Sequence, residues 1–148
     1  MILSLQGQKT IRALRNNEVM EQFLGVTDPS GPPAIAVVTV WPFIQNYART
    51  RFAVTLHEVV EIDDGEWHSL QDLPPLDKRE SRGMGRDLVL RDSPREALEY
   101  AEWFTGATRD RWVTCFKTDD QYEEWMKAGR PLLPSAAAAA TRRRQPAP

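Results

Sequence analysis

Two stretches in the second half of the chain carry a complete set of helix start and stop signals. Ser93-Pro94-Arg95-Glu96 is a capping box with proline at the first helical position, and Gly106 follows as a stop. Thr118-Asp119-Asp120-Gln121 repeats the box, with Gly129 as its stop. Because a short apolar segment precedes each box, we predict strand–helix alternation: strands over 87–92 and 111–117, and helices over 94–105 and 119–128.

A third apolar run predicts the centre of a sheet. Residues 34–41 read Ala-Ile-Ala-Val-Val-Thr-Val-Trp, which is apolar on both faces of a strand, and Pro42 is expected to end it. A longer strand is predicted over 51–62, where apolar residues fall on one face.

Asp64-Gly65 is a signal for a two-residue hairpin turn after that long strand. The return strand would then be 66–70. In this register Ile62 would lie opposite Trp67, and Glu61 opposite His68.

The N-terminal part is predicted to be helical. Apolar residues recur with imperfect helical spacing over 9–24, where Asn16-Asn17 could divide the helix into two and Gly25 would end it. Residues 2–5 are a possible short strand.

Together these elements predict an α+β domain over residues 1–130. We expect a mainly antiparallel sheet of about five strands with two or three helices packed on it. Helices 94–105 and 119–128 would share one face, and strands 87–92 and 111–117 could be parallel neighbours. The Ala-, Pro- and Arg-rich residues 131–148 are expected to form a disordered, flexible tail.

Composition narrows the class of protein. The chain has 148 residues, 41% hydrophobic and 27% charged, which is ordinary for a globular domain. A single cysteine, Cys115, excludes an internal disulfide framework and favours a reducing compartment. We expect a cytoplasmic location, no membrane span and no signal peptide, because no apolar run is long enough.

The leading functional hypothesis is a non-enzymatic protein–protein interaction module, either a regulator, an inhibitor or an accessory subunit. It rests on acidic and aromatic residues expected at the surface, where aromatic anchors and charges often carry binding. The candidate partner-binding residues are Asp63, Asp64, Glu66, Trp67, Tyr100, Trp103 and Trp125.

An alternative hypothesis is association with nucleic acid or another anion. Residues 78–86 form a glycine-containing basic loop, and the tail ends in an arginine run, so both could contact phosphates. The residues concerned are Arg79, Arg82, Arg86, Arg142, Arg143 and Arg144.

A third hypothesis is a small enzyme that uses His57 or His68 with a carboxylate. Glu58 interrupts an apolar strand face, and is either buried there or rotated outward by a bulge. Cys115 lies among apolar residues and is expected to be inert. No catalytic set, cofactor motif or metal-ligand spacing emerges, so we expect no cofactor and no metal.

Overall fold

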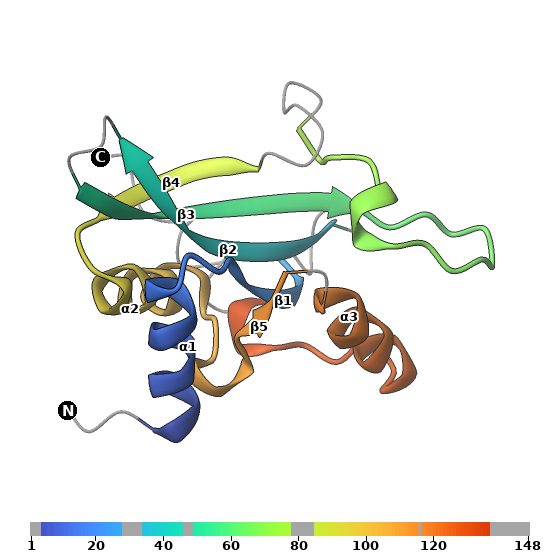
Figure 1. Ribbon diagram of the computed structural model, residues 1–148. Helices are drawn as coiled ribbons and strands as arrows, with labels where there is room; N and C mark the ends of the chain where they lie inside the picture. Colours follow the sequence, from blue (N-terminus) through green and yellow to red (C-terminus); the bar gives the residue numbers. More distant parts are fainter. Residues whose placement is uncertain (1–3, 28–33, 46–48, 78–84, 116, 137–148) are drawn as a thin grey trace.

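The computed structural model describes residues 4–27, 34–45, 49–77, 85–115 and 117–136. Five antiparallel strands form one sheet in the order β4-β3-β2-β1-β5, with three α-helices packed on it (Figure 1). The predicted α+β class is confirmed. The elements are α1 (Leu5–Arg15), β1 (Met20–Val26), β2 (Ala34–Gln45), β3 (Arg49–Val60), β4 (Arg86–Arg91), α2 (Pro94–Thr105), β5 (Val113–Thr114) and α3 (Thr118–Lys127).

The long pair β2–β3 forms the centre of the sheet. Its register is continuous from Ala34 opposite Val60 to Gln45 opposite Arg49. The prediction that Pro42 ends β2 is wrong. β1 begins opposite Val40, so β2 has a neighbour on one side only beyond that point, and a proline is tolerated on such an open edge.

The predicted helix over 9–24 is correct only in its first half. Ser4 caps α1, its hydroxyl accepting from the Gly7 N–H at 3.0 Å. The helix stops before Asn17, whose φ of 63° is left-handed, and residues from Met20 onward form β1. β1 lies between two strands and places buried apolar residues on both faces of the sheet, and this pattern resembles a helix when read by periodicity alone.

Gly25 is a bulge residue in β1 and does not end a helix. The register between β1 and β2 shifts between Phe23 and Gly25, and Gly25 has a φ of 74°. A Cβ there would lie 3.1 Å from Leu133 and 3.3 Å from Trp125. Both the conformation and the close contact therefore require glycine.

The two capping boxes differ in outcome. In α2 the Ser93 hydroxyl accepts from the Glu96 N–H, Pro94 is the first residue and Gly106 ends the helix with a φ of 74°, as predicted. α3 begins one residue early: Thr118 is its first residue, and no side chain caps it.

The edges of the sheet contradict two predictions. β4 and β5 lie at opposite edges, so they are not parallel neighbours. β5 spans only Val113–Thr114 of the predicted 111–117. Since β4 precedes α2 and β5 follows it, the α2 segment carries the chain across the width of the sheet.

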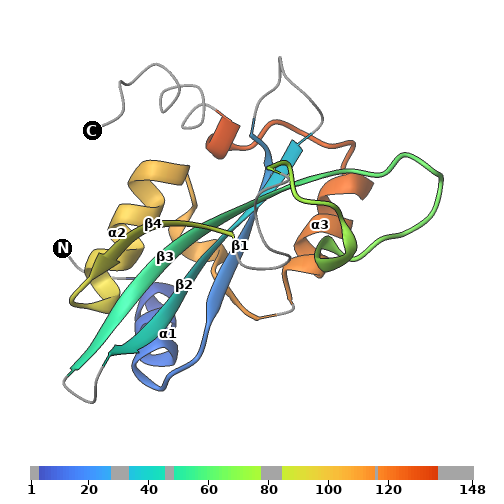
Figure 2. The ribbon, with the colours of Figure 1, turned by 90° about the horizontal axis from the view of Figure 1, so that it is seen from above.

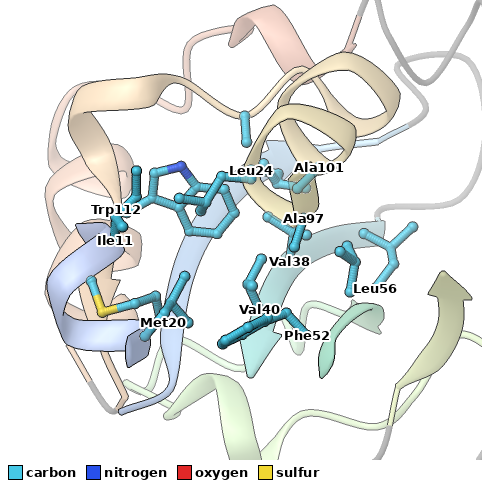
Figure 3. Packing of buried hydrophobic residues seen from close by; sticks show 14 of the residues in the cluster. Ile11, Met20, Leu24, Val38, Val40, Phe52, Leu56, Ala97, Ala101 and Trp112 are labelled. Atoms are coloured by element: carbon cyan, nitrogen blue, oxygen red, sulfur yellow. The ribbon is translucent and has the colours of Figure 1, made fainter. Parts of the chain in front are cut away.

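The sheet is buried on both faces, and each face meets different helices. On one face, strand residues such as Val38 and Leu56 pack against α1, α2 and Trp112 (Figure 3). On the other face, the alternate residues Ile35 and Val37 pack against α3. The prediction that the helices now labelled α2 and α3 share a face is wrong. Figures 1 and 2 place α1 and α2 together toward one end of the strands and α3 toward the other.

The first residues of the expected tail pack against the domain. Leu133 joins the apolar cluster under α3, Ser135 and Ala136 are buried, and the Ser135 hydroxyl donates to the Leu24 carbonyl in β1. The ordered chain therefore continues to at least Ala136. The remaining tail residues, 137–148, lie outside the described part of the chain.

Candidate functional site

Residues 61–69, named the acidic loop here, project from the end of β3 (Figure 1). The predicted hairpin is wrong in this region. After Val60 the chain forms a loop and then a short 3-10 helix, Leu70–Asp72, and only Pro75 returns to pair with Val59. Contacts with α3 replace the expected cross-strand pairs.

The first root of the loop is fixed by Glu61. Its carboxylate accepts from the Tyr122 hydroxyl at 2.8 Å and from Arg130 Nη2 at 3.1 Å. His68 is therefore not the partner of Glu61, contrary to the predicted register. Burial, reinforced by the hydrogen bond to Glu61, raises the pKa of Tyr122 above its usual value.

The second root is fixed by Asp119 in the first turn of α3. One carboxylate oxygen accepts from the Leu70 N–H at 2.9 Å, and the other accepts from the Ser69 hydroxyl at 2.7 Å. Leu70 itself is buried. The two roots together attach both ends of the acidic loop to α3 and its C-terminal extension.

The tip is shaped by Asp64. Its carboxylate accepts from the Glu66 N–H at 2.9 Å and lies 2.8 Å from His68 Nε2. These hydrogen bonds, the backbone one first, hold the pKa of Asp64 below its usual value. The chain therefore bends at Asp64-Gly65, where the Asp64 side chain closes the bend, but the predicted two-residue hairpin turn does not form.

Asp64, Glu66 and His68 also bring three potential ligand atoms within 4.8 Å of one another. Asp64 and Glu66 are exposed, and the Asp64 carboxylate is already engaged by the Glu66 N–H and by His68. A cation would have to displace these bonds and would gain only an exposed site. We assign no metal to the cluster.

The outer surface of the loop is acidic and partly apolar. Trp67 is 51% exposed, with its ring 5.5 Å from that of Tyr122, and Ile62 is 42% exposed. Asp63 and Glu66 are exposed, and neither side chain has an ion pair within the described residues. Negative charge and an accessible indole therefore lie side by side on one element.

The aromatic residues predicted on α2 form a separate patch. Tyr100 stacks on Phe104 with ring centroids 5.4 Å apart, Trp103 is 68% exposed, and the Arg91 guanidinium lies 5.1 Å from the Tyr100 ring. α2 and the acidic loop lie at opposite ends of the molecule (Figures 1 and 2). The candidate partner-binding residues on α2 and those on the acidic loop therefore belong to two separate surfaces.

Trp125 belongs to neither of them. It is only 4% exposed, packs edge-on against Phe23, and donates its indole N–H to the Pro131 carbonyl at 2.8 Å. This buried position does not fit the expected role of Trp125 as a partner contact. Trp125 and Tyr122 are three residues apart and share one face of α3, and that face packs on the core.

The residues considered for catalysis are dispersed. Glu58 and His57 point to opposite faces of β3, and Cys115 follows β5, which lies three strands away from β3 in the sheet. The register beside Glu58 is continuous with β2, so no bulge rotates it. It is half-buried and accepts from the Thr27 hydroxyl at 3.0 Å. Among the described residues these groups do not assemble a nucleophile and a base.

The basic alternative falls largely outside the described residues, which exclude Arg79, Arg82 and Arg142 to Arg144. Arg86 is described: it is the exposed first residue of β4.

A basic groove between α1 and α2 went unpredicted. It has a volume of about 400 Å³ and is lined by Gln8, Ile11, Arg12, Arg15 and Arg95. A signal was available in the sequence, because α1 carries Lys9, Arg12 and Arg15 and no acidic residue. The third arginine comes from α2, and only the fold brings it to this place.

Comparison with known proteins adds nothing to this description: no family model, curated protein or solved structure matches the chain. In the described part of the chain, each helix is too short or too polar to cross a bilayer.

Proposed function

We propose that this chain is a non-enzymatic protein-recognition module, a regulator, inhibitor or accessory subunit, whose acidic loop binds a basic surface on a partner protein. The observation that supports it is the contrast between the roots and the tip of that loop. Hydrogen bonds to the carboxylates of Glu61 and Asp119 hold the roots, while Asp63, Glu66 and Trp67 remain exposed.

A loop held in place favours binding because less conformational entropy is lost when a partner docks. The roots supply that order through α3, and the Asp64 carboxylate supplies it at the tip. Burial of Leu70 at one root keeps the loop attached to the core.

The chemistry of the tip indicates the kind of partner. Three acidic residues lie within positions 63–66, and no Lys or Arg occurs from 57 to 77. Such a charge accelerates encounter with a basic surface and opposes acidic ones. Trp67 adds a large, partly exposed ring of the type that dominates interface energies.

The test compares four immobilised baits in extracts of the source cells: wild type, D63K/E66K, W67A, and the control E18K/D87K. The control reverses two exposed acids away from the loop and changes the net charge equally. We expect a partner retained by wild type and control, and weakened about tenfold or more by D63K/E66K and by W67A. Retention should also fall as salt rises.

Thermal unfolding of each bait, followed by circular dichroism, separates lost binding from lost fold. Equal retention of every protein by D63K/E66K and wild type, with both folded, would contradict the proposal. Loss of the partner by the E18K/D87K control as well would contradict it too, because overall charge and not the acidic loop would then be responsible.

A further inference from the structure

The groove between α1 and α2 has a chemistry opposite to that of the acidic loop. Arg12 and Arg15 are three residues apart on α1 and so share one flank of it, and Arg95 faces them from the first turn of α2. Ile11, which is 9% exposed, contributes an apolar wall. Three guanidinium groups therefore line one concave surface.

Arg12 and Arg15 differ from other arginines in the described part of the chain. Arg49, Arg109 and Arg130 each pair with a carboxylate at 2.8–3.1 Å. Arg12 and Arg15 are exposed and have no ion pair within the described residues, while Arg95 lies 3.9 Å from Glu99. The charges of Arg12 and Arg15 are thus not balanced by an ion pair within the described residues, whereas Arg95 is paired with Glu99.

A structural explanation for Arg12 and Arg15 is that both lie in the last turn of α1, where cations interact with the helix dipole. That dipole end is equivalent to roughly half a negative charge. It cannot offset the two guanidinium groups of Arg12 and Arg15, so a net positive potential remains beside α1.

The groove continues toward a small cavity that shares Ile11 and Arg95 with it. This cavity has a volume of about 10 Å³, and Trp112 forms part of its wall. The Trp112 side chain is almost fully buried, and its indole N–H has no hydrogen-bond partner within the described residues. A buried donor without a partner is costly, and a single bound water, which is the most this cavity can hold, would satisfy it.

We propose that this groove is a binding site for a small molecule that carries two or more phosphate groups, such as a diphosphate. Guanidinium groups bind phosphate oxygens through paired, charge-assisted hydrogen bonds, and three of them line this groove, two of them without an ion pair in the described residues. The volume also lies in the range of small-ligand sites. The site is separate from the acidic loop and does not depend on its function.

A long polyanion fits less well. Glu96, Glu99 and Asp110 are exposed on or near the same two helices, and they would repel an extended phosphate backbone beyond the groove. The net charge of −2 includes three arginines at positions 142–144, so the rest of the chain carries −5. A compact ligand avoids most of this negative charge.

The test is titration calorimetry of the full chain with inorganic pyrophosphate, at low salt and neutral pH. The variant R12Q/R15Q removes two groove charges, and the control R86Q/K117Q removes two charges elsewhere from exposed residues. We expect one pyrophosphate to bind per chain. In R12Q/R15Q its affinity should fall about tenfold for each charge-assisted hydrogen bond that is lost, and in the control its affinity should change little. Orthophosphate and sulfate should bind more weakly than pyrophosphate.

Further arms separate the sources of phosphate. A nucleoside diphosphate that competes with pyrophosphate supports the groove as a nucleotide-sized site, and supports the proposal. No pyrophosphate binding, or equal binding by R12Q/R15Q and wild type with both folded by circular dichroism, would overturn it. Tight, steeply salt-dependent binding of a DNA or RNA oligonucleotide without pyrophosphate binding would also overturn it.

Discussion

Two surfaces at opposite ends of this molecule carry opposite charge and are held in place in different ways. At one end, α1 and α2 rest on an apolar cluster that includes Trp112, and their outer groove is basic. At the other end, the acidic loop is attached to α3 by hydrogen bonds of Glu61 and Asp119. The net charge of −2 for the whole chain therefore describes neither surface.

The same contrast bears on stability. Loss of a residue in an apolar cluster that contacts several elements destabilises the whole domain, because those elements unfold together. Loss of a hydrogen bond at the root of a loop opens that loop locally while the sheet stays folded. The two ends should therefore respond differently to single substitutions.

The largest effect is expected for Trp112→Ala. Trp112 is 2% exposed and packs in the cluster beneath α1 and α2, so its truncation leaves a cavity that costs about 3–5 kcal/mol. This loss of stability is measured as the change in the free energy of unfolding, obtained by urea titration. Trp67→Ala is the matched control: this side chain is 51% exposed, and we expect a loss of about 1 kcal/mol or less. Equal losses for the two variants would contradict the proposed difference between the ends.

A smaller, local effect is expected for Asp119→Ala. The substitution removes the acceptors of the Leu70 N–H and the Ser69 hydroxyl, at a cost of about 2 kcal/mol. Amide hydrogen exchange should accelerate at Leu70 and along the acidic loop, and remain slow in β2. Asp120→Ala changes the charge of the same helical turn but removes no hydrogen bond to the loop. Amide exchange in the acidic loop of this control should therefore match wild type. Faster exchange throughout the sheet in Asp119→Ala would show that the loop is not an independent unit.

Local signals in the sequence predicted much of the fold. The Ser93 capping box and Gly106 set the bounds of α2, and the apolar run from Ala34 predicted the central strand. The misassigned segments are those whose conformation is decided by neighbours distant in sequence. Met20–Val26 is a strand because it lies between β2 and β5, and 66–70 is no strand because Trp67 and Ser69 contact α3.

A candidate surface could be predicted from the sequence when its residues are close together along the chain, and not when they come from distant segments. The acidic loop is a continuous stretch, and composition alone identified it. The basic groove combines Arg12 and Arg15 with Arg95, which is 80 positions later, and the pairing exists only in the folded chain. Trp125 was misplaced for a related reason: an aromatic residue on an amphipathic helix has the same local pattern whether it faces the core or a partner.

The smallest effect concerns the pH dependence of the loop root at Tyr122. Burial and the hydrogen bond to Glu61 raise the pKa of Tyr122, so the folded chain keeps a proton that the unfolded chain loses above about pH 10. The stabilisation from this hydroxyl, about 1 kcal/mol at neutral pH, should therefore diminish as pH rises past that value. The difference in unfolding free energy between wild type and Tyr122→Phe, measured from pH 7 to 11, should narrow above pH 10. Tyr100→Phe controls for loss of a hydroxyl at the other end of the molecule. A difference that stays constant across the range would mean that the Glu61–Tyr122 bond does not hold the loop root, and the comparison between the two ends would then rest on Asp119 alone.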